Sequence, residues 1–290
     1  MRRNFAQILK DAQIDIKMEY QKLYGMLFDR SIQISNMNRI SAYDELSERF
    51  IDFYFRGTCL SIDEFNNMHG FHFEKEPSDF NIDHLVSLCE YIYNMLMAYQ
   101  GVQGSMGYGY MTGMHAPINV QFYFMQINQI IEEIGYMQAN EDGITIFIEK
   151  CPAAIAVAES DLIPTNLSYR LISYHHYAMK GNIEAKKAVL VQLASILEAK
   201  RGDLKKVDKV LESDLFYIFN NLNIRHNNIS AEDPGKYKAY VAQMSTENLE
   251  KWYDEAYQMC LLAFLELENI DRKVEFDQVK GEIEKYQLQY

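Results

Sequence analysis

The sequence predicts a mainly α-helical protein that contains one small β-hairpin. Apolar residues recur at three- and four-residue intervals along most of the chain, which is the spacing of helix faces packed on a core. Only 5 prolines and 14 glycines interrupt the 290 residues, and one short stretch near the middle has the composition of strands. Because 48% of the residues are apolar, the chain can bury one large core or two modest ones, and intrinsic disorder is excluded.

Residues 1–142 are predicted to form an N-terminal helical region. Ser41 and Ser61 are each followed three residues later by an acidic residue, which is typical of a capping box at the start of a helix. Five glycines within residues 101–113 predict a mobile surface loop. The helices of this region are expected at about 4–28, from Ser41 through Arg56, from Ser61, from Asn81 to about Tyr99, and from about Val120 to Gly135.

Residues 143–160 are predicted to form a β-hairpin at the junction between two helical parts. Residues 143–149 and 153–158 are short apolar runs, and Lys150-Cys151-Pro152 separates them. A two-stranded hairpin is too small to be stable alone, so we expect it to lie against helices.

Residues 161–290 are predicted to form a C-terminal helical bundle. Pro164 is expected to open a helix that runs through Lys180, Gly181 to end it, and Asn182 to cap the next one. Further helices are expected over 203–222, from a Ser245 cap through Leu249–Leu267, and in a separate charged segment at the end. The side chains of the Leu249–Leu267 helix that should face the core are Trp252, Tyr253, Tyr257, Cys260, Leu261, Phe264 and Leu265.

Charge is distributed unevenly along the chain, whose net charge is −13. Residues 1–177 hold 12 basic and 22 acidic side chains, so this acidic part repels polyanions and suits a protein partner instead. Residues 186–209 hold seven basic and three acidic side chains and form the most basic stretch. The four cysteines lack paired spacing, and charge interrupts the apolar residues near the N-terminus, so we expect a cytoplasmic protein with reduced thiols and no membrane segment.

The most unusual local sequence is Asn220-Asn-Leu-Asn-Ile-Arg-His-Asn-Asn228. Arg225 would supply a fixed cation and His226 a proton carrier that titrates near neutral pH, which suits phosphodiester cleavage without a metal or other cofactor. The residues predicted to bind the substrate around them are Asn221, Asn223, Asn227, Asn228, Lys205 and Lys206. The asparagines also suit an elaborate helix terminus, where their amides satisfy free backbone groups, so this alternative stays open.

This segment and the long helix after it, Trp252 to Leu267, resemble the HEPN-like helical domains of bacterial abortive-infection and toxin proteins. The resemblance covers roughly residues 160–270 and implies a metal-independent ribonuclease of phage defence that acts on RNA as a homodimer. The signature of that superfamily separates its Arg and His by four to six residues, whereas Arg225 and His226 are adjacent. Four residues do separate Arg170 from His175, and five separate it from His176, which makes these three residues secondary candidates on a segment that also suits a helix interior.

A non-enzymatic function is the competing hypothesis. The acidic N-terminal region and the Met- and Tyr-rich segment 101–113 favour a helical sensor or interaction protein. Bulky aromatic side chains around the last long helix predict a homodimer under either hypothesis. No metal site is predicted, because the histidines with ligand-like spacing, His69 and His72, flank a glycine in a stretch without a fixed scaffold.

Overall fold

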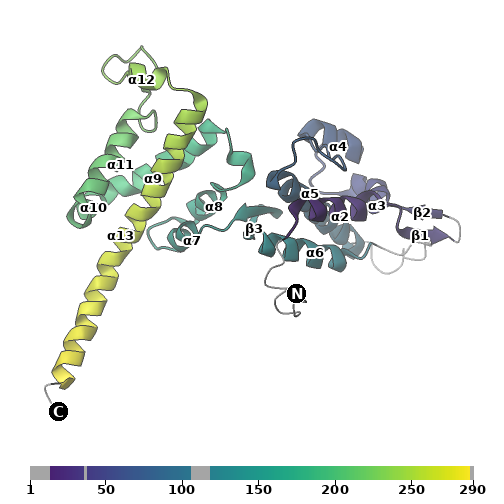
Figure 1. Ribbon diagram of the computed structural model, residues 1–290, viewed down its shortest axis with the longest axis horizontal. Coiled ribbons are helices and arrows are strands. Elements are labelled where there is room, and N and C mark those ends of the chain that lie inside the picture. The colour runs from purple at the N-terminus through teal and green to yellow at the C-terminus, as the bar shows by residue number, and fades with distance from the viewer. Residues whose placement is uncertain (1–13, 36–37, 106–117, 288–290) are drawn as a thin grey trace, which may run out of the picture. The chain divides into compact units, whose positions relative to one another are not determined.

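The computed structural model describes residues 14–35, 38–105 and 118–287, and the chain divides into two compact units, Met1–Phe147 and Ile148–Tyr290 (Figure 1). Within the described residues there are twelve α-helices and two two-stranded antiparallel sheets. This secondary-structure content confirms the predicted mainly α class with a small hairpin.

The N-terminal unit is built around its longest helix, α5. Helices α2, α3 and α6 all pack against α5, whose buried face includes Leu85, Leu88, Ile92 and Leu96. The elements in chain order are α2 (Ile16–Phe28), β1 (Ile32–Ser35), β2 (Asn38–Ile40), α3 (Ala42–Arg49), η1 (Phe50–Asp52), α4 (Ile62–His69), α5 (Ile82–Ser105), α6 (Val120–Glu133), β3 (Tyr136–Glu141) and β4 (Ile144–Glu149).

The predicted caps at Ser41 and Ser61 are present. Ser41 Oγ accepts from the backbone N of Asp44 at 3.0 Å, and the Asp44 carboxylate accepts from the backbone N of Ser41 at 2.9 Å, which completes a capping box. Ser61 Oγ accepts from the backbone N of Glu64 at 3.1 Å, so Ser61 caps α4. Helix α3 ends at Arg49 instead of Arg56, because the chain then tightens into η1, where Phe50 is fully buried.

Two other N-terminal boundaries differ from the prediction. Helix α5 continues through Gly101 and Gly104 to Ser105 instead of ending near Tyr99, because each glycine costs a helix only about 1 kcal/mol and Val102 is buried there. The rest of the glycine-rich segment 101–113 lies outside the described residues, as does the start of the helix expected from residue 4.

The hairpin is present, but one of its two predicted strands is wrong. Strand β4 pairs with β3, which precedes it, and not with residues 153–158. Asp142 and Gly143 form the two-residue turn, and both have positive φ (50° and 84°), as a tight turn between twisted strands requires. Residues 153–158 belong instead to α7 (Pro152–Ala158), since Pro152 suits the first position of a helix and alanine favours helix over strand.

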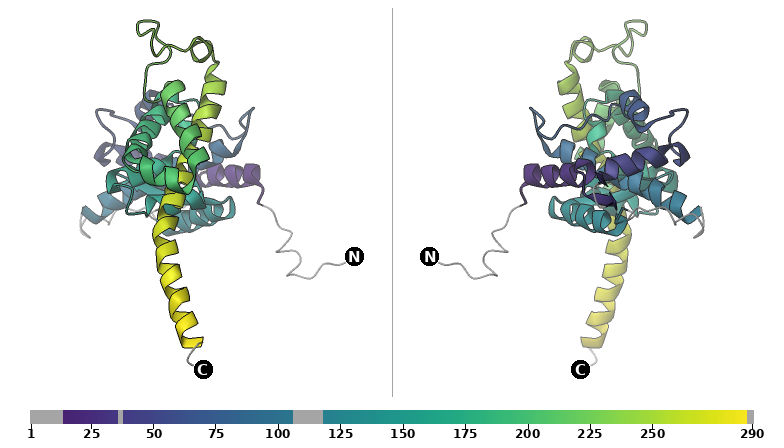
Figure 2. Two further views of the ribbon diagram at one scale, coloured as in Figure 1. Left: turned by 90° about the vertical axis from the view of Figure 1, so that its left-hand side faces the viewer. Right: turned by 90° about the vertical axis from the view of Figure 1, so that its right-hand side faces the viewer.

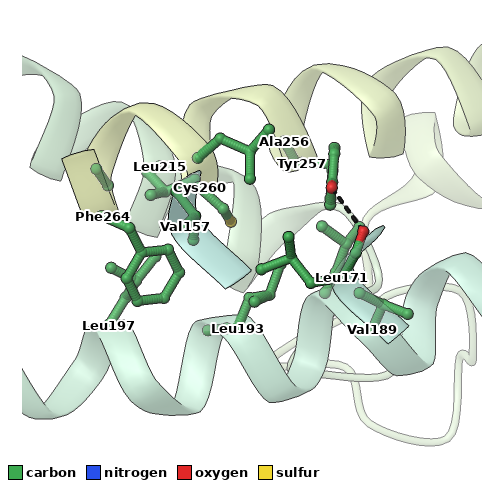
Figure 3. Close-up of a cluster of buried hydrophobic side chains, with 14 of the residues drawn as sticks. Val157, Leu171, Val189, Leu193, Leu197, Leu215, Ala256, Tyr257, Cys260 and Phe264 are labelled. Atoms are coloured by element: carbon green, nitrogen blue, oxygen red, sulfur yellow. Dashed lines mark hydrogen bonds between the residues drawn. The ribbon is translucent and has the colours of Figure 1, made fainter. Parts of the chain in front are cut away.

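The C-terminal unit is a helical bundle around α13, against which α7, α9, α10 and α11 pack. Its core is formed by apolar side chains such as Leu193, Leu197 and Phe264, all fully buried (Figure 3). Tyr257 is fully buried in this core, and its hydroxyl donates to the backbone carbonyl of Leu171 at 2.7 Å (Figure 3). The elements after α7 are α8 (Thr165–Ser173), η3 (Tyr177–Met179), α9 (Ile183–Ala199), α10 (Arg201–Val207), α11 (Lys209–Asn221), α12 (Ala239–Ala242) and α13 (Thr246–Gln287).

The predicted helix start at Asn182 is confirmed, whereas Gly181 does not end the helix that Pro164 precedes. Gly181 has a φ of 73°, and Asn182 Oδ1 accepts from the backbone N of Ala185 at 3.1 Å at the start of α9. The helix that Pro164 precedes ends at Ser173 instead of Lys180, because the chain turns at His175 and His176 before η3. The segment that holds His175 and His176 is therefore irregular and is not the interior of a helix.

The last two predicted helices are one continuous helix, α13, of 42 residues. Ser245 Oγ accepts from the backbone N of Asn248 at 3.3 Å and caps it, as expected. Trp252 is 43% exposed, so the prediction that it faces the core is wrong. Tyr253 is the buried residue, and the Trp252 side chain leaves the helix in a direction about 100° away from that of Tyr253. In its second half, α13 extends past α9, α10 and α11, and its side chains at 272–280 and 282–286 are exposed (Figures 1 and 2).

Candidate functional site

Arg225 and His226 lie in the loop between α11 and α12, residues 222–238, which we call the Arg–His loop. The chain turns sharply at Asn223, whose φ of 58° lies in the left-handed region that asparagine tolerates. The backbone N of Asn223 donates to Asn228 Oδ1 at 2.8 Å, and the backbone N of Asn228 donates to Asn223 Oδ1 at 3.3 Å. Two asparagines therefore bond to each other's backbone and close a short turn between them.

Further hydrogen bonds attach this turn to the bundle. Asn228, which is fully buried, donates from Nδ2 to the carbonyl of Lys236 at 2.7 Å. Its own carbonyl accepts from the backbone N of Lys238 at 2.8 Å. The hydroxyl of the buried Tyr253 on α13 donates to the Asn223 carbonyl at 3.3 Å. Asn223 and Asn228 therefore hold the loop in shape, and Arg225 and Asn227 lie on its exposed side.

The Arg225 side chain is 31% exposed and forms an ion pair through Nη1 with Glu198, near the end of α9. The other Glu198 oxygen lies 4.0 Å from Arg201 Nη1, and Arg201 Nε donates to the buried Glu212 of α11 at 2.5 Å. The Arg201 guanidinium also lies over the ring of Phe216, 4.2 Å from its centroid. Arg225 is therefore one end of a chain of two arginines and two glutamates. Since an arginine has five N–H donors, the bond to Glu198 leaves others for a ligand.

Lys236 is the neighbour of His226, with its Nζ 3.1 Å from Nδ1 of the imidazole. The pKa of His226 is lowered by partial desolvation and by the positive charges of Lys236 and Arg225, against a smaller opposite effect of Asp233. These effects favour the neutral form of the imidazole. Because an ammonium group has only donors, Nδ1 is the acceptor in this pair and Nε2 carries the proton, so His226 presents an N–H donor to solvent.

The other predicted substrate-binding residues are dispersed. Asn221 donates from Nδ2 to the Tyr217 carbonyl at 2.8 Å, within its own helix. Lys205 and Lys206 are exposed on α10, and Lys206 pairs with Asp203 at 2.8 Å. A pocket of about 600 Å³ includes Lys206 among its lining residues but neither Arg225 nor His226. This pocket carries both signs of charge, from Asp161, Lys200, Asp203, Lys206, Glu268 and Arg272.

The secondary candidates lie elsewhere in the unit. Arg170 is exposed on α8, and His176 caps η3 by accepting from the backbone N of Ala178 at 3.2 Å. His175 packs edge-on against the ring of Tyr257 at 5.3 Å, and its buried Nε2 has no hydrogen-bond partner. Burial lowers the pKa of His175, although Glu149 and Asp254 act in the opposite direction. No hydrogen bond or ion pair given for the described residues joins these three residues to Arg225.

Two of the seven cations of the basic stretch 186–209, Lys186 and Arg201, form ion pairs with carboxylates of other helices. Lys186 is 4% exposed, and its Nζ lies 2.7 Å from both Glu250 and Asp254 of α13. The hydrogen bond from Lys186 is the main cause that lowers the pKa of Glu250. Asp254 also accepts from the hydroxyl of Tyr174 at 2.9 Å. Lys186 is therefore a structural cation of the bundle and not part of an exposed basic surface.

Sequence reasoning missed two partners of the candidate residues, Lys236 and Glu198. Lys236 follows the Pro234-Gly235 turn, and this turn signal was visible, but nothing local indicates that it brings Lys236 back to His226. Glu198 lies 27 positions before Arg225 on another helix. Among the residues that the structure describes, no three His, Cys, Asp or Glu side chains are grouped as a metal site, and no helix is long and apolar enough to span a membrane.

Comparison with known proteins assigns no family, because no family model, no curated protein and no solved structure matches the chain.

Proposed function

We propose that this protein is an RNA-directed effector of the kind found in bacterial phage defence, and that Arg225 and His226 act on the phosphate backbone. The observation that carries the proposal is the pairing of Lys236 with Nδ1 of His226, 3.1 Å apart, beside the exposed Arg225. Three donor-bearing side chains thus lie on one loop that buried asparagines hold in shape. The resemblance to HEPN-like domains concerns the same segment, in which Arg225 and His226 are adjacent instead of four to six residues apart.

The chemistry that suits this arrangement is metal-independent cleavage of RNA. Arg225 would stabilise the negative charge that develops on the phosphate oxygens, and the Nε2–H of His226 would donate a hydrogen bond to one of those oxygens. As a neutral imidazole, His226 would transfer a proton only as a general base, which requires Lys236 to release the Nδ1 lone pair. Nδ1 would then take the proton of the attacking hydroxyl, and the imidazolium so formed would be the acid that protonates the leaving oxygen.

The proposal is tested by incubating the purified full chain with cellular RNA in excess chelator. His226→Ala and Arg225→Ala should each lower the cleavage rate about 100-fold or more, which is the usual contribution of such groups. Ile229→Ala is the matched control, since Ile229 is 48% exposed in the same loop and is not among the residues predicted to bind the substrate. Equal cleavage by the wild type and His226→Ala, or no cleavage by either, would contradict the proposal that the protein is a ribonuclease.

The second candidate function is a non-enzymatic helical sensor or interaction module. The specific observation in its favour is that Arg225 already has a carboxylate partner, Glu198, and that Asn223 and Asn228 bond to the backbone. Under this alternative the Arg–His loop is only a helix terminus. The same variants would then bind single-stranded RNA no differently from the wild type.

A further inference from the structure

An exposed apolar row runs along the second half of α13. Phe276, Val279, Ile283 and Tyr286 are 59%, 53%, 54% and 64% exposed, although all four are large and apolar or aromatic. Their spacing of three, four and three residues is that of positions a and d in a heptad repeat. Residues at such positions line one side of a helix, so this row has the form of a coiled-coil seam that lacks its second strand.

The charged residues on either side of this row are sorted by sign. With Phe276 and Ile283 at position a, the e positions are Lys273 and Lys280, and the g positions are Glu275 and Glu282. All four side chains are exposed. One flank of the row is therefore basic and the other acidic, and charges at e and g are what select the partner and the orientation of a coiled coil.

We propose that residues 273–286 of α13 bind the same residues of a second copy of this chain as a parallel two-stranded coiled coil. In a parallel pair, each g residue faces the e residue five positions later on the other helix, so Glu275 meets the partner's Lys280. In an antiparallel pair, e would face e and g would face g, which opposes lysine to lysine and glutamate to glutamate. The charge pattern therefore matches a second copy of this helix in one orientation only.

The existing contacts of these side chains do not prevent the pairing. Lys280 lies 3.2 Å from Asp277 and 4.5 Å from the centre of the Phe276 ring, but the Lys280 and Asp277 side chains are 54% and 59% exposed. Exposed pairs within one helix contribute little, so Lys280 can exchange Asp277 for the partner's Glu275 at small cost. A membrane surface is a poorer fit for this face, because acidic residues flank the apolar row where a surface-binding helix carries basic ones. The inference is independent of whether the Arg–His loop acts on RNA.

The oligomeric state of the full chain tests this inference by sedimentation velocity over a concentration series. The wild type should dimerise, and Ile283→Lys should raise the dissociation constant about 100-fold or more, because it removes a buried apolar side chain from each copy. Val274→Lys is the matched control, since Val274 is 55% exposed on the same helix but lies outside the a and d positions. A monomeric wild type, or a dimer that Ile283→Lys leaves intact, would overturn the proposal.

The orientation is tested by a charge exchange. Lys280→Glu should weaken the dimer about 5- to 10-fold, because Glu275 would then face a glutamate of the partner, and adding Glu275→Lys should restore it. An antiparallel dimer would be indifferent to the single change, which exchanges one like-charge pair for another. Since neither residue touches the Arg–His loop, RNA cleavage by the monomer and loss of the dimer are separately observable.

Discussion

Asn228 makes the hydrogen bonds that hold the Arg–His loop, so its replacement by alanine is the sharpest perturbation of this part of the structure. The side chain accepts from the backbone N of Asn223 at 2.8 Å and donates to the carbonyl of Lys236 at 2.7 Å. Asn228 is fully buried, and Asn223 is 4% exposed. Alanine removes both bonds and leaves a buried N–H and a partly buried carbonyl without partners.

The magnitude follows from the burial of the two groups. Leaving a buried donor or acceptor unsatisfied costs about 1–3 kcal/mol. The cost for the Asn223 backbone N–H is in the upper part of this range because the group is buried, and the cost for the Lys236 carbonyl is lower because Lys236 is exposed. We therefore expect Asn228→Ala to lower the free energy of unfolding of the C-terminal unit by about 2–4 kcal/mol.

The assay is urea unfolding followed by the fluorescence of Trp252. This is the only tryptophan of the chain, and it adjoins Tyr253, whose hydroxyl bonds to Asn223, so its signal reports the C-terminal unit. Asn227→Ala is the control and should change the free energy of unfolding by less than about 0.5 kcal/mol, as exposed substitutions usually do. A change of the same small size for Asn228→Ala would refute the reasoning that the asparagine pair holds the loop.

Three other predictions concern burial, pH and backbone conformation. Lys186→Ala should destabilise the C-terminal unit by about 2–3 kcal/mol in the same assay, because it leaves Glu250 and Asp254 without their shared cation; a neutral result would contradict a structural role. The pKa of His175 is lowered by burial, so the unfolded chain binds more protons below about pH 6.5, and the free energy of unfolding should fall as the pH drops from 7 to 5. His175→Gln should flatten that dependence, and an unchanged slope would mean that the burial does not matter. Gly143→Ala should cost about 1 kcal/mol, seen as a lower melting temperature by circular dichroism, because the φ of Gly143 is 84°; no shift would argue against the tight turn.

The fold was predictable where a local signal has one interpretation. Ser41, Ser61 and Asn182 are helix caps because each short side chain accepts from the backbone N three residues later, and this local chemistry does not depend on the rest of the chain. Residues 153–158 were misassigned because a short apolar run suits a buried strand or a buried helix equally well. Pro152 and the alanines decide for helix, and Asp142-Gly143 is the turn that joins β4 to the strand before it.

The sequence singles out Arg225 and His226 as a candidate site but does not reveal the partners of these two residues. The unusual density of Arg, His and Asn in one segment is a local property, and it led to Arg225 and His226. The ion pairs of two cations in the stretch 186–209 are not local, because helix packing brings Glu212 to Arg201, and Glu250 with Asp254 to Lys186. A charge summed over a window of sequence counts only neighbours along the chain, so it could not show that these cations have partners.

The central claim is that His226 presents a neutral imidazole to RNA beside Arg225, and nitrogen-detected NMR of the histidine side chains during titration with short single-stranded RNA tests it most directly. His226 is identified by the signal that disappears in His226→Ala. Before RNA is added, we expect that signal to show a proton on Nε2 and a pKa below the usual 6.5 of histidine. RNA should then shift the signal and raise the pKa, because a nearby phosphate favours the charged imidazolium. An ordinary pKa that RNA leaves unchanged would contradict the claim.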